Sequence, residues 1–185
     1  MVVDFRRRHS TVRSVNIQGR DIERVDSYKY LGVHLNNKLD WSHNTDALYR
    51  KGQSRLCLLR RLRSFGVRGS LLKTFYGSVV ASAILYGVVC WNSSITERER
   101  KKLDKVIKKS SSVLGCPLDS VQEVGDRRVL ANVISMLGHE SHPLQDALSV
   151  LESSFSDRLI HPCCVKERFR RSFLPAAVRL YNEHC

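Results

Sequence analysis

The residue types that most often hold a metal ion gather near the end of the sequence. The candidates are His161, Cys163, Cys164, His184 and Cys185. Zinc takes Cys and His ligands tetrahedrally, and its sites usually separate two paired ligands by intervening residues. Adjacent cysteines cannot chelate as a C-x-x-C pair does, and the sequence has no second pair. We therefore predict no metal site and no cofactor.

Signatures of catalysis are equally sparse. No Ser-His-Asp or Cys-His arrangement has a recognisable local pattern, and neither common type of glycine-rich phosphate loop is present. Two-metal nucleotidyl chemistry needs paired carboxylates to hold magnesium. The nearest acids, Asp4, Asp21, Glu23, Asp26 and Asp40, are single residues without an adjacent pair on a hairpin turn. We predict that the chain as it stands is not an enzyme.

The positive charge is the property of the sequence that indicates a partner. Lys and Arg number 31 and Asp and Glu number 18, which gives a formal net charge of +13 and a pI near 9.8. Such an excess favours phosphate-rich partners, and the interleaved aromatic residues favour nucleic acid over an anionic membrane surface. A merely soluble basic domain is the alternative that charge leaves open.

Two segments concentrate these cations. The first, residues 50–63, lies in a region without any acid between Asp46 and Glu97. The second, residues 98–109, places its cations opposite the apolar side of an expected helix. Each cation that neutralises one phosphate makes binding more salt-dependent, whereas a solvated surface is the alternative. The predicted nucleic-acid-binding residues of these segments are Arg50, Lys51, Arg55, Arg60, Arg61, Arg63, Arg98, Lys101, Lys102, Lys105, Lys108 and Lys109.

The N-terminal residues have the pattern of β-strands. Residues 2–5 read as a strand, and residues 12–17 and 22–25 alternate around a turn at 18–20, which predicts a hairpin. Residues 28–35 alternate again, so we expect one more antiparallel strand, with a bulge or a close backbone approach at Gly32. Asp40 or Ser42 is then expected to cap the first helix.

The remainder of the sequence predicts helices. Residues 42–65 have helical spacing and stop at Gly66, and a capping box at residues 96–99 opens a helix that ends at Gly115. Between them, residues 71–90 are apolar on most sides, which predicts the buried centre of a bundle with Leu71 and Tyr86 in its core. The apolar run over residues 79–91 is too short to span a bilayer.

Further helices are expected over residues 120–137, 145–160 and 166–182, with Phe155 on the apolar side of the second and Pro175 at the start or at a break of the last. The predicted fold class is α+β, mostly α. A short antiparallel β-hairpin or three-strand meander precedes a helical bundle.

The cysteines bear on the compartment. The sequence has six, without a repeated spacing, and residues 1–4 are followed at once by Phe5-Arg-Arg-Arg8, which is unlike a signal peptide. This pattern indicates reduced thiols in an intracellular protein and leaves nucleus and cytoplasm open.

Tyr28-Lys-Tyr-Leu-Gly-Val33, followed by Leu39-Asp40-Trp41, resembles the segment after the palm in reverse transcriptases of non-LTR (LINE-type) retrotransposons. The resemblance continues through residues 1–6, 76–91, 141–143 and 168–180. It implies that the primer-grip residues of this chain are Tyr28, Lys29, Tyr30, Leu31 and Gly32.

The same resemblance implies a division of the chain. Residues 1–41 would form the end of the palm with the primer grip, residues 42–115 a thumb-like bundle, and residues 116–185 a C-terminal helical region. The family's catalytic aspartates and fingers would lie before Met1, so the expectation is a truncated, non-catalytic fragment. Its expected partners are RNA or DNA, bound through phosphates, and the missing palm and fingers. A structural helical domain without activity is the other interpretation.

Residues 2–41 are also similar to a segment attributed to the N-terminus of AlkB-homologue-eight proteins, which modify tRNA. Those proteins use an iron/2-oxoglutarate oxygenase domain and a methyltransferase domain. This sequence has no H-x-D iron pair and no glycine-rich loop for a methyl donor. This similarity would therefore relate the segment to that family by name, without implying the family's catalytic activity.

Overall fold

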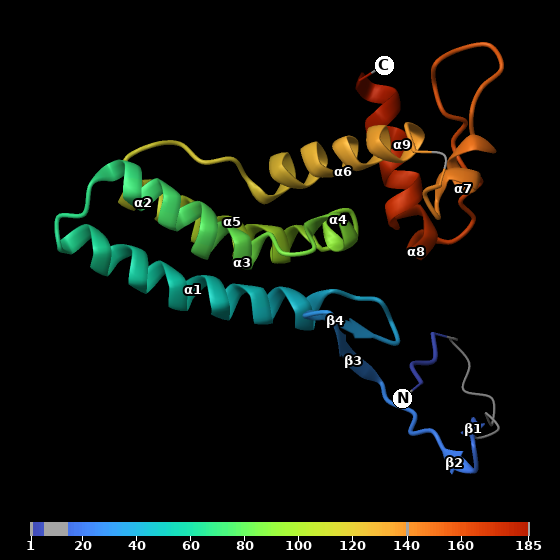
Figure 1. The fold of residues 1–185 in the computed structure, drawn as a ribbon, viewed down its shortest axis with the longest axis horizontal. Helices are drawn as coiled ribbons and strands as arrows, with labels where there is room; N and C mark the ends of the chain where they lie inside the picture. Colours follow the sequence, from blue (N-terminus) through green and yellow to red (C-terminus); the bar gives the residue numbers. More distant parts are fainter. Residues whose placement is uncertain (1, 6–14, 140, 185) are drawn as a thin grey trace.

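The computed structural model describes residues 2–5, 15–139 and 141–184. In these ranges two small antiparallel strand pairs come first and helices follow, so the predicted fold class is confirmed (Figure 1). The predicted strand over residues 12–17 lies outside the described residues at 12–14. Residues 2–5 form a single parallel bridge, from Val2 to Arg24, in place of the predicted strand.

The first hairpin pairs β1 (Asn16–Ile17) with β2 (Arg20–Asp21). Gln18 and Gly19 turn the chain between them with φ angles of 52° and 77°. Positive φ at both central residues gives a turn whose twist matches that of the flanking strands. The predicted turn is therefore present, and it ends one residue earlier than expected.

The second hairpin replaces the single strand predicted over residues 28–35. β3 (Ser27–Tyr30) pairs with β4 (Val33–Asn36), and the chain folds back at Leu31 and Gly32, whose φ angles are 45° and 85°. β3 and β4 pair only with each other in the described residues, so no three-strand meander forms. The single-strand prediction was wrong because a two-residue turn preserves the alternation of side chains across the fold-back.

The helices begin directly after the second hairpin. α1 (Ser42–Ser64) leads away from it, and α5 (Glu97–Leu114) packs beside α1 (Figure 1). Neither Asp40 nor Ser42 is the N-cap of α1, which is Trp41; the Asp40 carboxylate instead accepts hydrogen bonds from the Ser42 hydroxyl and backbone N–H. The remaining elements are α2 (Gly69–Phe75), the π-helix η1 (Tyr76–Ala81), α3 (Ser82–Ile84), α4 (Val88–Trp91), α6 (Val121–Leu137), α7 (Gln145–Ser149), α8 (Glu167–Arg170) and α9 (Phe173–His184).

The apolar segment between α1 and α5 is not one buried helix. It passes through the π-helix η1 and breaks at Gly87, where φ is 60°. Leu71 is 59% exposed and Tyr86 is 50% exposed, so neither belongs to the core as predicted. Although this segment is apolar on most sides, one side is buried against α1 and the opposite side is exposed. By length and composition alone, Gly69–Trp91 would suffice to cross a membrane, a test that core helices also pass.

Close approaches between helices hold the bundle together. A Cβ atom at Gly52 of α1 would lie 2.5 Å from Cγ2 of Ile84, so the two helices touch at this glycine. The residues of the largest core cluster include Leu48, Ile84, Leu85, Trp91, Leu103, Ile107 and Val121. A second cluster joins α6, α7 and α9 through Val129, Val133, Leu148, Ala177 and Val178.

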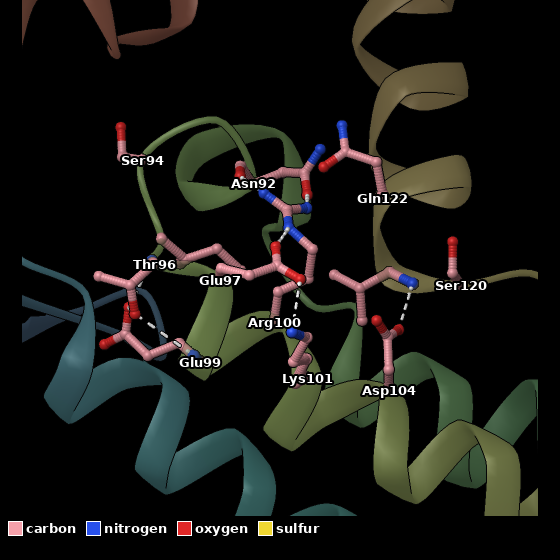
Figure 2. A network of polar contacts seen from close by, with 12 residues as sticks. Asn92, Ser94, Thr96, Glu97, Glu99, Arg100, Lys101, Asp104, Ser120 and Gln122 are labelled. Carbon is pink, nitrogen blue, oxygen red and sulfur yellow. Dashed lines mark hydrogen bonds and ion pairs between the residues drawn. The ribbon is translucent and has the colours of Figure 1, made fainter.

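Both long later helices begin with a capping box, as residues 96–99 predict for α5. The Thr96 hydroxyl accepts the Glu99 backbone N–H, and the Glu99 carboxylate accepts the Thr96 N–H (Figure 2). Ser120 and Glu123 form the same arrangement in α6. Asp104 of α5 accepts the Val121 N–H at 2.9 Å, which links the start of α6 to α5.

The C-terminal third departs most from the predicted elements. Within residues 145–160 the helix is limited to α7, and Phe155 is 99% exposed where an inward position was expected. Pro175 lies buried in the first turn of α9, where proline is tolerated because the backbone N–H of that turn has no helical partner.

Candidate nucleic-acid interface

The tip of the second hairpin is fixed to the helical bundle. The Tyr86 hydroxyl donates a hydrogen bond of 2.7 Å to the backbone carbonyl of Leu31. The Tyr86 ring also covers Gly32, because a Cβ atom there would lie 3.2 Å from Cε1 of the ring. Gly32 therefore permits both the left-handed turn and the close contact with Tyr86.

A cavity of about 210 Å³ lies between this tip and the helices. Its lining includes Gly32, Lys51, Arg55, Ser82 and Tyr86. The Arg55 Nη1 atom donates to the Val79 carbonyl at 2.8 Å, so this guanidinium is held in place by the π-helix. Lys51 and the remaining N–H groups of Arg55 provide positive charge and hydrogen-bond donors at this hollow, which suit a phosphate. The Tyr86 and Ser82 hydroxyls already donate to backbone carbonyls.

The hairpin separates the other predicted grip residues onto two faces. Tyr28 and Tyr30 share one face and are 41% and 57% exposed. Lys29 lies on the opposite face, directly across from His34 in the register. Successive side chains of a strand point to opposite sides, so these three residues cannot contact one ligand as a single row.

The cations of α1 do not form one face. About 100° of rotation per residue places Arg50 and Arg61 on one side of the helix and Arg60 and Arg63 on another. All four are exposed. Lys51 and Arg55 lie on a third side, at the hairpin cavity. Of the six cations predicted on this helix, the structure brings these two together with Gly32.

The six cations predicted on α5 fall within about 120° of the helix circumference, as their spacing requires, and Arg100 lies outside this stripe. Within this stripe, Lys102 already has partners on α1. It forms an ion pair with Asp46, and its Nζ atom lies 4.9 Å from the centroid of the Tyr49 ring. Lys101 pairs with Glu97 at 3.6 Å in an exposed position. Within the described residues, Arg98, Lys105, Lys108 and Lys109 have no side-chain hydrogen bond or ion pair and remain available for phosphate.

The interface also contains residues that the sequence did not single out. Tyr86 and Ser82 sit in the apolar segment over residues 71–90, for which the sequence predicts a buried helix. His34 and His43 bring their rings to a centroid distance of 4.9 Å, although one is on β4 and the other on α1. The helix breaks at Gly87, and Tyr86 is exposed beside this break. A glycine within an apolar helical segment is the sequence signal that can indicate such a break.

The single acids of the N-terminal region have structural contacts. Asp4 pairs with Arg24 at 3.2 Å, Asp26 accepts from the Asn37 amide at 2.9 Å, and Asp40 accepts from Ser42. The Ser42 hydroxyl is the main reason that the pKa of Asp40 lies below its usual value. Among the residues described, no cluster of three His, Cys, Asp or Glu side chains has an arrangement that would hold a metal ion.

With this geometry established, the likeness to known proteins is limited to one segment. Residues 41–82 match the family model described as "Alkylated DNA repair protein alkB homolog 8, N-terminal". The match covers α1, α2 and η1. It begins at the residue where we expected this similarity to end, so the placement over residues 2–41 was wrong.

Neither the curated proteins nor the solved structures compared with the chain gave a match. The family match covers a minority of the chain, so it shows similarity of that segment alone. The matched family is not a reverse transcriptase. The division of the chain after residues 41 and 115 stays a prediction.

Proposed function

We propose that this chain is a nucleic-acid-binding module that performs no catalysis of its own. The observation that supports this most directly is the hairpin tip, where Lys51 and Arg55 flank the fixed turn at Gly32. The open cations of α5, which are Arg98, Lys105, Lys108 and Lys109, provide a second surface for phosphates. Binding through these groups releases counterions and shows little sequence preference.

The second part of the proposal concerns the family of proteins that the chain resembles. We infer that residues 28–32 act as a primer grip and that α1 to α5 act as a thumb, as in non-LTR reverse transcriptases. The resemblance at residues 28–33 supports this, and so does a glycine-tipped hairpin that contacts a helical bundle through Tyr86. The family match over residues 41–82 favours instead an AlkB-homologue-like label for the helices.

Salt titration tests the binding. We expect the affinity for a labelled duplex to fall steeply with salt, and the logarithmic slope to decrease by about 0.9 for each phosphate that a variant no longer neutralises. The double variant Lys105→Gln/Lys108→Gln should lower both the affinity and the slope. Arg20→Gln/Lys73→Gln changes the net charge equally at exposed positions outside the proposed surfaces, and serves as the matched control.

Fluorescence anisotropy at several salt concentrations measures these slopes. Affinity that is the same at low and high salt, or an equal decrease in the control pair, contradicts the binding surface. For the primer grip, a duplex with a recessed 3′ end should bind more tightly than a blunt duplex. Equal affinities contradict the grip and leave general binding intact, whereas primer extension by the purified chain contradicts the absence of catalysis.

A further inference from the structure

Two histidines meet where the second hairpin packs on α1. The His34 and His43 rings are stacked, with centroids 4.9 Å apart and an interplanar angle of 21°. The backbone N–H of His34 donates to Oδ1 of Asn44 at 3.2 Å, which fixes β4 against the first turn of α1. His34 is half-buried and His43 is exposed, so the pair is positioned by the fold and open to solvent on one side.

The charged groups around the pair are mostly positive. Lys29 of β3 lies across from His34, and Lys51 of α1 also acts on it electrostatically. The carboxylate of Asp46 of α1 lies close enough for His43 to act on it electrostatically, but it is held by Lys102 of α5. The two imidazoles therefore lie among cations, with their neighbouring acid already paired.

These surroundings disfavour a protonated His34 in the free chain. Burial is the first cause that lowers the pKa of His34 below 6.5, followed by repulsion from His43, Lys29 and Lys51. A phosphate at this place would reverse the balance, because an anion beside an imidazole favours its charged form. A protonated imidazole then donates a charge-assisted hydrogen bond to a phosphate oxygen.

We propose that the stacked His34–His43 pair, with Lys29 and Lys51 near His34, is a phosphate-binding site that takes up a proton when nucleic acid binds. The proton comes from solvent and returns to it on release. This inference rests on the proposed nucleic-acid binding and adds two residues to its surface. It also makes the affinity depend on pH, because bound phosphate and bound proton stabilise each other.

The test uses the full chain and an oligothymidylate with a cyanine label, so that neither the bases nor the label titrate over the pH range of the experiment. Affinity is measured at constant ionic strength between about pH 8 and pH 5.5, where an ordinary histidine changes its charge. Uptake of one proton predicts that affinity rises up to roughly tenfold for each pH unit in the range where uptake is complete. The double variant His34→Gln/His43→Gln should lose this rise and keep its salt dependence.

The controls separate this inference from a folding effect. His161→Gln removes an exposed histidine far along the chain and should retain the full pH dependence. His43→Gln changes the exposed member alone and should reduce the pH dependence while circular dichroism stays unchanged. Histidine proton resonances give a second reading: the titrations of His34 and His43 should move to higher pH on adding the oligonucleotide, and that of His161 should not.

A wild-type affinity that depends on salt but not on pH overturns this inference and leaves the proposed function standing. The same follows if the double variant keeps the full pH dependence. Absence of binding at every pH and at low salt overturns both.

Discussion

Leu31 and Gly32 adopt left-handed backbone conformations, and together they determine where the hairpin tip lies. Leucine at φ 45° is strained because its Cβ atom crowds the following carbonyl, whereas glycine at φ 85° has no such penalty. Tyr86 covers the glycine and binds the Leu31 carbonyl, so the tip is held beside the cations of α1. At the scale of single residues, the candidate site depends on a glycine and a tyrosine that lie far apart in the sequence.

Replacement of Gly32 by alanine tests this contact. Gly32→Ala should lower the free energy of unfolding by about 2 kcal/mol, because left-handed strain adds to the crowding of the Tyr86 ring. Gly19→Ala is the matched control: its φ of 77° gives similar strain, but no atom lies within 4 Å of the new Cβ. Urea unfolding measures both, and equal decreases in stability would show that contact with Tyr86 is unimportant.

Asp46 makes the stability of the folded chain depend on pH in the acidic range. The hydrogen bond from Lys102 is the first cause that lowers the pKa of Asp46, so this carboxyl binds protons less readily in the folded state than in the unfolded state. Its stabilising contribution is present above the unfolded pKa of 3.8 and is lost as the pH falls through the folded value. The pair is half-exposed, which limits its contribution to about 0.5 kcal/mol.

Asp46→Asn should therefore lower stability slightly at pH 7 and flatten the loss of stability below about pH 4. Melting curves over this pH range measure the effect. Asp119→Asn removes a different exposed acid, which pairs with Arg127 at 2.8 Å, and it serves as the comparison for the loss of a surface carboxylate. An acid dependence that remains unchanged in Asp46→Asn would contradict the assigned role of Lys102.

At the scale of elements, α6 packs on α4 through a glycine and a buried amide. A Cβ atom at Gly125 would overlap the side chain of Asn92, which is 2% exposed. Asn92 donates to Asp126 at 3.0 Å and accepts from the Arg100 guanidinium at 2.7 Å, and Figure 2 shows Arg100 directed toward it. This network sets the position of α6 relative to α5 because each buried polar group needs its partner.

Gly125→Ala should consequently destabilise the chain by about 2 kcal/mol, since the helices must separate or the amide must lose its partners. Gly77→Ala places the same methyl group in open space within a helical segment and should be neutral or stabilising. Thermal unfolding followed by circular dichroism compares the two. A Gly125→Ala variant as stable as the Gly77→Ala variant would contradict close packing at Asn92.

At the scale of the whole molecule, Arg171 ties the C-terminal helices to the loop before α5. Its guanidinium donates to the carbonyls of Ser94 and Ile95 at 2.9 and 3.1 Å, and its own carbonyl accepts from the Ser93 and Ser94 hydroxyls. The segment between α8 and α9 thereby contacts the bundle directly. In Figure 1, α9 crosses beside α6, next to the end of the α2–α4 segment.

Arg171→Ala should loosen this connection at a cost of about 2 kcal/mol, because two carbonyls lose a charged donor. We expect faster proteolysis near α8 and faster amide exchange in α9, with little change in α1. Arg170→Ala removes a neighbouring arginine that forms an exposed pair with Glu167 at 3.2 Å, and it should change little. Equal proteolysis of the two variants would contradict the role of Arg171.

Local interactions are what the sequence by itself determined. The capping box of Thr96 and Glu99, the stop of α1 near Gly66 and the end of α5 at Gly115 involve residues within one turn of each other. The stripe of cations on α5 follows from the helical repeat alone. These features were predictable because no distant part of the chain is needed to produce them.

Tertiary contacts decided the rest. The contact of the Gly32 turn with Tyr86, the exposure of Tyr86 and the stack of His34 on His43 each depend on an element that the local pattern does not contain. Tyr86 and Leu31 are 55 residues apart and still form one hydrogen bond. Alternation and helical periodicity report which side of an element is apolar, but not which distant element meets it, and the candidate site forms where such elements meet.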